Sequence, residues 1–136
     1  MQKLFIVHIP SFYYDVIFSI GQTDKELKRG LKKICHPDDL TEISKNLNLK
    51  EGIGGLCSEL DNRASVIRMP KYPKGKERVF ILACLQHEIF HASCNVMRSI
   101  DTKLTKSTEE VYAYIITYLT EECYKQLDYG VSSVKS

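Results

Sequence analysis

Four short stretches of the chain are largely apolar, and each ends at a proline, a glycine or a polar turn. Apolar runs bounded in this way are typical of β-strands. The last two runs flank the polar sequence Asp61-Asn62-Arg63, which is the pattern of a hairpin with a tight turn. The pattern therefore predicts strands over residues 3–8, 12–20, 56–60 and 64–69.

Helical periodicity occupies the stretches between and after these strands. Thr23 suits the N-cap position of a helix over about 24–35, and an apolar stripe predicts a shorter helix over about 38–48. The segment 77–98 is apolar on nearly every face, which is typical of a central, buried helix. A last helix is predicted from 107 to about 127.

The elements follow one another in the order β-β-α-α-β-β-α-α, which predicts an α+β fold with helices packed on a small mixed sheet. With 136 residues the chain has the length of a single domain, residues 1–136. We expect residues 1–76 to form its N-terminal strands and helices. Residues 77–128 would form a pair of C-terminal helices, and 129–136 a frayed tail.

Composition and charge narrow the class of protein. Hydrophobic residues make up 43% and charged residues 26% of the chain, as in an ordinary soluble domain, and the net charge of +2 does not indicate a nucleic-acid partner. The apolar runs near the N-terminus are too short to span a membrane. Five scattered cysteines without a CxxC pair favour reduced thiols and a cytoplasmic location.

The sequence His87-Glu88-Ile89-Phe90-His91 carries the most specific chemical signal. Histidines at i and i+4 lie on one helical face, so both imidazoles can reach one ion at the roughly 2.0–2.1 Å of a Zn–N bond. Glu88 lies about 100° round the helix from His87, where its carboxylate can exchange protons with a water near the ion. In a buried helix these groups need partners, and one zinc ion with a water would satisfy all three.

Two histidines do not complete a zinc site, so a third ligand is expected. Four residues are poorly placed because of their spacing, their position on the same straight helix or their place in a linker: His8, His36, Cys94 and Asp101. Glu109 and Glu110 open the next helix, and an antiparallel neighbour helix would bring one of them level with the histidines. Glu110 has an alternative role, in a capping box with Ser107.

The HEIFH motif and the later segment Glu110-Val111-Tyr112-Ala113 resemble the HExxH…ExxA pattern of the gluzincins, a group of zinc metallopeptidases. The pattern is shared by membrane CAAX-type proteases and small soluble relatives, and the likeness covers about residues 80–122. The resemblance implies that His87, His91 and Glu110 are metal ligands. It also implies that Glu88 is the general base and that Ala113 allows two helices to approach closely.

One position departs from that pattern. Tyr114 stands where an acidic or amide residue usually follows the alanine. In this respect the chain is similar to small zincin-like proteins encoded by bacteriophages and prophages. Tyr112, Tyr114 and Tyr118 are candidates for stabilising an oxyanion, although a tyrosine stripe on a helix is also common in a core. Strand 64–69 is either an edge strand that aligns a peptide substrate or an ordinary strand of the sheet.

We therefore expect a zinc-dependent metallopeptidase that acts on a peptide or protein. The alternative from another class is a phage virion, tail or assembly protein that keeps a zincin-like fold with a structural or vestigial metal site. A metal-free domain, in which HEIFH is only a polar face, is the third interpretation. Zinc binding distinguishes it from the first two.

Overall fold

A four-stranded mixed sheet lies at the centre of the computed structural model, which describes residues 1–35, 47–61 and 63–127. The strands are β1 (Lys3–Ile9), β2 (Tyr14–Ile20), β3 (Leu56–Asp61) and β4 (Ala64–Met69), in the order β1-β2-β4-β3. β1 and β2 are antiparallel, as are β3 and β4, while β2 and β4 run parallel. The sheet confirms the predicted α+β class and all four predicted strands, with ends that differ by one or two residues.

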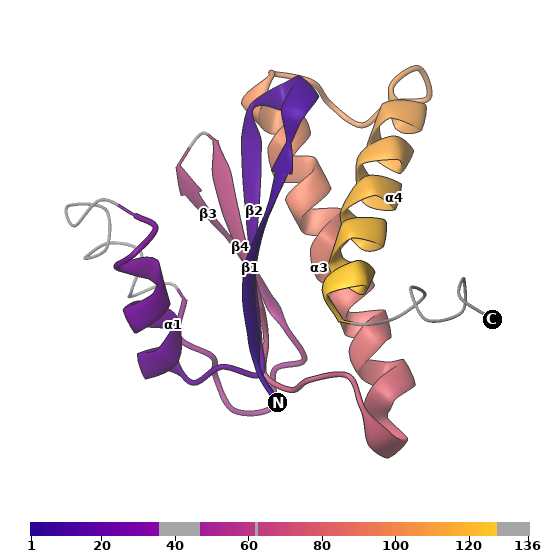
Figure 1. Cartoon of the computed structure of the whole chain (residues 1–136). Helices are drawn as coiled ribbons and strands as arrows, with labels where there is room; N and C mark the ends of the chain where they lie inside the picture. Colours follow the sequence, from indigo (N-terminus) through magenta and orange to yellow (C-terminus); the bar gives the residue numbers. More distant parts are fainter. Residues whose placement is uncertain (36–46, 62, 128–136) are drawn as a thin grey trace.

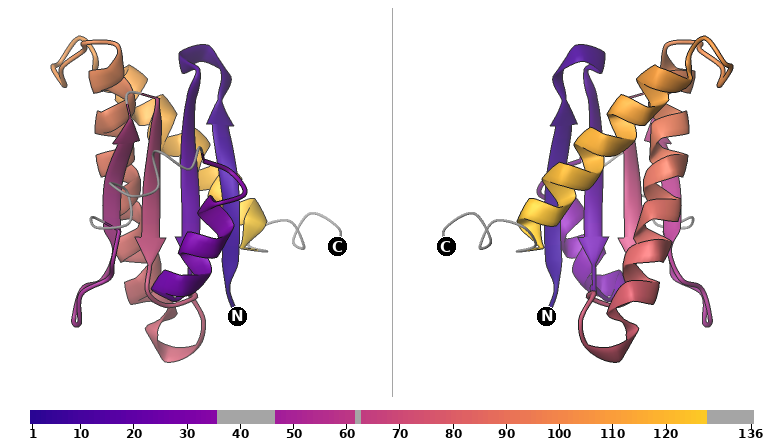
Figure 2. Two further views of the ribbon diagram at one scale, coloured as in Figure 1. Left: turned by 90° about the vertical axis from the view of Figure 1, so that its left-hand side faces the viewer. Right: turned by 90° about the vertical axis from the view of Figure 1, so that its right-hand side faces the viewer.

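Within the described residues, three helices cover the two faces of this sheet (Figures 1 and 2). α1 (Asp24–Leu31) lies against one face, and α3 (Arg78–Ser99) and α4 (Glu109–Gln126) lie against the other. Short 3-10 turns, η1 (Pro10–Phe12) and η2 (Gly75–Glu77), precede β2 and α3. Among the described residues no helix is long and apolar enough to cross a membrane.

Side-chain alternation along β4 divides the core between the two faces. Ile67 and Met69 belong to the larger cluster, together with Ile89 of α3 and Leu119 of α4. Val66 belongs to the smaller cluster beneath α1, with Ile17, Leu27, Leu31 and Leu47. Because successive residues of a strand point to opposite faces, β4 anchors both layers. The larger cluster fixes how α3 lies on the sheet.

Two helix predictions need correction. The helix expected over 24–35 ends at Leu31 and continues as hydrogen-bonded turns to Cys35. Most of the helix expected over 38–48 lies outside the described residues, and Leu47 and Asn48 are not helical. The capping box predicted from Ser107 is wrong. Thr108 is the N-cap of α4, its hydroxyl bonds to the backbone of Lys103 and Thr105, and α4 begins at Glu109.

The expectation that the helix over 77–98 is buried all round is also wrong. Val79 and Phe80 are 73% and 66% exposed, and Phe90 is 41% exposed. The sheet and α4 cover only part of the surface of α3, so the outer side of the helix faces solvent whatever its residue types. The prediction from apolar residues on nearly every face therefore overestimated the burial of α3.

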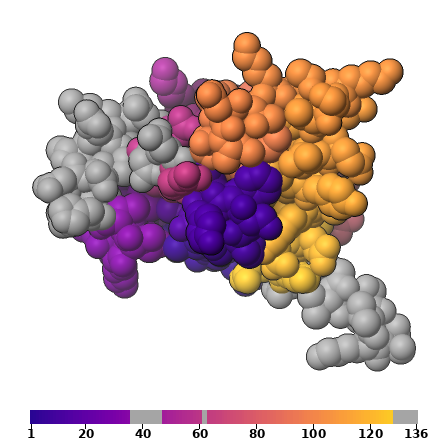
Figure 3. Space-filling model, turned by 90° about the horizontal axis from the view of Figure 1, so that it is seen from above, coloured from indigo at the N-terminus to yellow at the C-terminus, as the bar shows by residue number. Residues whose placement is uncertain are grey.

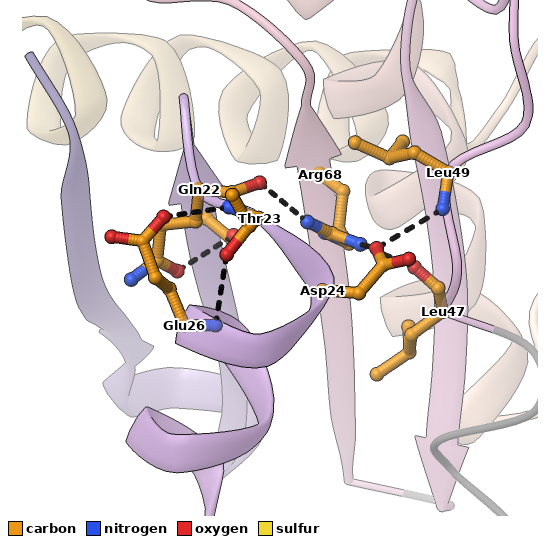
Figure 4. Close-up of polar contacts among 8 residues, drawn as sticks. Gln22, Thr23, Asp24, Glu26, Leu47, Leu49 and Arg68 are labelled. Carbon is orange, nitrogen blue, oxygen red and sulfur yellow. Dashed lines mark hydrogen bonds and ion pairs between the residues drawn. The ribbon is translucent and has the colours of Figure 1, made fainter.

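A buried arginine joins the sheet to α1 (Figure 4). The Arg68 side chain is 1% exposed. Its Nη1 donates to Asp24 Oδ1 at 2.5 Å and to the Leu47 carbonyl at 2.7 Å, and its Nη2 donates to the Gln22 carbonyl at 2.7 Å. Asp24 opens α1, so this contact fixes the N-terminal end of the helix on the sheet.

The Arg68–Asp24 contact makes the stability of the fold depend on pH. The hydrogen bond from Arg68 is the main cause that lowers the pKa of Asp24, with smaller contributions from the Leu49 amide and from Lys28. A carboxyl with a lowered pKa stabilises the fold above its unfolded pKa and loses that contribution as pH falls through its folded pKa. We measure the free energy of unfolding in denaturant from about pH 6 down to about pH 3. We expect it to fall less with pH in Asp24→Asn than in wild type. Parallel curves would contradict this.

Candidate metal centre

His87 and His91 meet on the outer side of α3. Both are exposed, their ring centroids are 4.8 Å apart, and the two Nε2 atoms are 3.1 Å apart. Their spacing on one helix places them one above the other. The sequence therefore predicted this pair correctly, whereas it overestimated the burial of the two rings.

The separation of the two nitrogens fits a shared metal ion. With Zn–N bonds of about 2.0–2.1 Å, nitrogens at this separation subtend roughly 100° at the ion, close to a tetrahedral angle. In the absence of an ion, the ring N–H of one imidazole donates to the ring nitrogen of the other. Both arrangements need at least one unprotonated ring nitrogen, and such a nitrogen is the metal-binding form of histidine.

Glu88 lies at the inner side of this pair. Its side chain is only 6% exposed, yet one oxygen and the histidine nitrogens all lie within 4.8 Å of one another. Burial raises the pKa of Glu88, while the neighbouring His87 and His91 act to lower it. A cation bound at the histidines would favour the charged form of this carboxylate further. The three residues therefore form a group that could hold a metal ion.

A hollow of about 420 Å³ opens beside the group. Residues 53–55 line one side of it, and Ala83, Cys84, His87 and Glu88 line the other. The chain comes unusually close to the helix here. A Cβ on Gly55 would lie 3.0 Å from Glu88 Cγ, and a Cβ on Gly54 would lie 2.9 Å from Cys84 Sγ. These two glycines allow the wall of the hollow to sit directly on α3.

Glu109 and Glu110 lie apart from the histidines. Gln86 Nε2 donates to Thr120 Oγ1 at 3.1 Å, so these two residues are level on the paired helices. α3 and α4 run in opposite directions (Figure 1), which puts Glu110, ten residues before Thr120, level with about residue 96. That position is five residues, or about 7 Å, beyond His91 along α3. The structure does not bring Glu110 into the metal-binding group, and its role as third ligand stays a prediction.

The start of α4 lies at the same end of the molecule as the β1–β2 turn (Figures 1 and 3). Glu109 and Glu110 are exposed in the first turn of the helix. Their negative charges interact favourably with the positive N-terminal end of the helix dipole, so the two residues stabilise α4 whether or not either of them binds a metal.

The remaining candidates are not part of the group either. His8 is bonded to Asp15 on the sheet at 2.7 Å, and His36 lies outside the described residues. Cys94 is half-buried and Asp101 is exposed in the loop after α3, and neither joins the histidines. Of the tyrosines, Tyr112 donates to the Thr102 carbonyl and Tyr118 to the His8 carbonyl, while Tyr114 is 69% exposed. Tyr112 and Tyr118 thus serve the packing of α4.

The strand that borders the site is not the one considered from the sequence. β4, residues 64–69, lies inside the sheet between β2 and β3, so its interpretation as an edge strand is wrong. β3 is at the edge, and the residues that lead into it line the hollow. Sequence order could not reveal this, because the parallel pairing of β2 with β4 puts the earlier strand, β3, outside.

Within the described residues, His87, Glu88 and His91 are the group of His, Cys, Asp and Glu side chains compact enough to hold a metal ion. Two imidazoles and a carboxylate suit zinc and neighbouring divalent metals. Compared with known protein families, with curated proteins and with solved structures, the chain matches none of them, and the possible metal site therefore rests on the geometry of these three residues.

Proposed function

We propose that this protein is a zinc-dependent peptidase in which His87 and His91 bind the ion and Glu88 is the general base. The observation that supports it best is the 3.1 Å separation of the histidine nitrogens next to a buried carboxylate and an open hollow. A purely structural zinc site is closed by four protein ligands, whereas this group leaves room for a water and a substrate.

The chemistry follows from the position of Glu88. A divalent cation at the histidines would polarise a peptide carbonyl and make a neighbouring water more acidic. Glu88 accepts a proton from the attacking water and passes it to the leaving amine. Its burial favours the protonated form, which suits a residue that must both take up and release a proton. His87 and His91 direct their Nε2 atoms toward the same point.

The edge of β3 is a suitable place for an extended peptide. In the described part of the sheet β3 pairs only with β4, so its other edge can accept a strand. Main-chain hydrogen bonds to such an edge bind a peptide with little demand on its sequence. A peptide continuing past Gly54 and Gly55 enters the hollow beside His87 and Glu88. The proposal keeps Glu110 as the third ligand that the resemblance to gluzincins implies, with Glu109 as its alternative.

One observation favours a second function, that of a virion, tail or assembly protein encoded by a phage. Neither glutamate of α4 lies with the histidines. Because Glu88 is assigned as the general base, the group contains only two of the three ligands of a His₂Glu site. A metal there would act as a staple or a relic and would not need an open position. Such a protein would be recovered with virion proteins in a fixed ratio.

Peptide cleavage tests the proposal. Purified protein with zinc added is incubated with a peptide library, and the products are identified by mass spectrometry. We expect cleavage that stops after treatment with a chelator and returns when zinc is restored. Hydrolysis that persists without metal would contradict the proposed chemistry. If no peptide is cleaved and the protein instead assembles with virion components, the second function is correct.

A further inference from the structure

Residues 47–55, which we name the wall segment, connect the two faces of the sheet. The segment begins with Leu47, which is buried beneath α1 in the smaller core cluster. It ends with residues 53–55, which line the hollow beside His87 and Glu88 on the opposite face. The same nine-residue stretch that packs on α1 therefore also forms one wall of the candidate site.

Arg68 holds both ends of the wall segment. Its guanidinium donates to the Leu47 carbonyl at 2.7 Å, at the first residue of the segment. Its backbone is the β-ladder partner of Leu56, the residue that follows the segment. The main-chain oxygen of Arg68 also lies 3.4 Å from the Cβ position of Gly55. A loop whose two ends meet in this way behaves as one compact unit.

Asp24 orients the arginine and binds the segment directly. Its Oδ1 accepts from Arg68 Nη1 at 2.5 Å and from the Leu49 amide at 3.4 Å (Figure 4). Arg68 Nε is buried and has no hydrogen-bond partner among the described residues. The arginine is therefore oriented by the contacts of its two terminal nitrogens, and Asp24 is the acidic residue among their partners.

We propose that Arg68 and Asp24 are positioning residues, which seat the wall segment on α3 and thereby shape the substrate side of the hollow next to His87 and Glu88. The inference rests on the proposed function for the role of the hollow, but not for the seating itself. Without the contacts that Arg68 and Asp24 make with the start of the wall segment, residues 53–55 would move away from α3. Substrate binding would weaken although neither residue touches the site.

Cys84 provides a direct measure of the seating, because Gly54 covers its thiol so closely that a Cβ would lie 2.9 Å from Sγ. The test compares alkylation of Cys84 by N-ethylmaleimide in wild type, Asp24→Ala and Asp24→Asn, with each cysteine followed by peptide mass spectrometry. All proteins are first freed of metal by a chelator. The fully buried Cys123 of α4 reports global unfolding in the same sample.

The matched control is Glu26→Ala. Glu26 lies in the same turn of α1 and accepts from the Thr23 amide at 2.9 Å, so its loss weakens the helix start without removing a bond to the wall segment. We expect Asp24→Ala to label Cys84 at least about fivefold faster than wild type, Asp24→Asn to be intermediate, and Glu26→Ala to stay near wild type. Cys123 should be unchanged.

Equal Cys84 rates in all the proteins would overturn the proposal, and so would an equal acceleration in Glu26→Ala. If Cys123 also reacts faster in Asp24→Ala, that variant is partly unfolded and Asp24→Asn is used instead. A Cys84 rate in Asp24→Asn equal to that of wild type or of Glu26→Ala would then overturn the proposal. In active protein, Asp24→Ala should raise KM more than it lowers kcat, because Glu88 and the histidines are unchanged. The labelling result needs neither metal nor hydrolysis, so a protein that cleaves nothing would refute the proposed function and leave the positioning role to be judged by Cys84.

Discussion

Glu88→Gln should lower kcat/KM for peptide hydrolysis by about 10²–10⁴-fold, the usual contribution of a general acid–base residue. The amide keeps the size of the side chain, so its close contact with Gly55 should persist. It cannot accept a proton from water, and the proton-transfer step is lost. Zinc content should stay near that of wild type, because His87 and His91 are intact.

Glu77→Gln is the control for this experiment. Glu77 is an exposed glutamate before α3, paired with Lys71 at 3.0 Å, and it lies outside the metal-binding group. We expect hydrolysis by this variant to match wild type. If Glu88→Gln cleaves as fast as Glu77→Gln, Glu88 is not the base and the proposed chemistry is wrong.

Arg68→Met should lower the free energy of unfolding by about 3 kcal/mol. Methionine fills much of the buried volume, but the carbonyls of Leu47 and Gln22 lose their donors and Asp24 loses its cation. Buried acceptors without partners are the main source of this loss. The partial exposure of Asp24 keeps the figure at the lower end of the range for a broken buried ion pair. Equilibrium unfolding in urea measures it.

The matching exposed pair provides the comparison. Lys71 and Glu77 are joined at 3.0 Å, with side chains 64% and 59% exposed. Lys71→Met should change the free energy of unfolding by less than about 1 kcal/mol, because exposed ion pairs contribute little. An Arg68→Met variant as stable as Lys71→Met would mean that the arginine does not organise α1 and the wall segment.

Local sequence patterns predicted the elements and the histidine pair. Apolar runs bounded by Pro10, Gly21 and Pro70 produced strands, and the i, i+4 spacing alone was enough to bring His87 and His91 together. Both depend on neighbours in the chain, and the helical and extended repeats of the backbone carry such information directly. The N-cap at Thr23 was predicted for the same reason, and its capping box with Glu26 is present.

Features that depend on long-range packing were not accessible from these patterns. Arg68 appears in the sequence as one charged residue inside a strand, and nothing nearby indicates that Asp24 and Leu47 will meet it. The edge position of β3 follows from the parallel pairing of β2 with β4, in which Val16 lies opposite Ser65, 49 residues later in the chain. No local signal sets this register. The level of Glu110 relative to His91 likewise depends on how α3 and α4 cross.

The most direct test of the metal site is the zinc content per chain after dialysis, measured by elemental analysis in wild type, His91→Ala and Glu110→Gln. We predict about one zinc ion per wild-type chain and a loss of zinc in His91→Ala, because one imidazole cannot hold the ion alone. Loss in Glu110→Gln as well would identify the third ligand. Well-folded wild-type protein that takes up no zinc, even when zinc is added in excess, would contradict the metal site and the peptidase proposed on it.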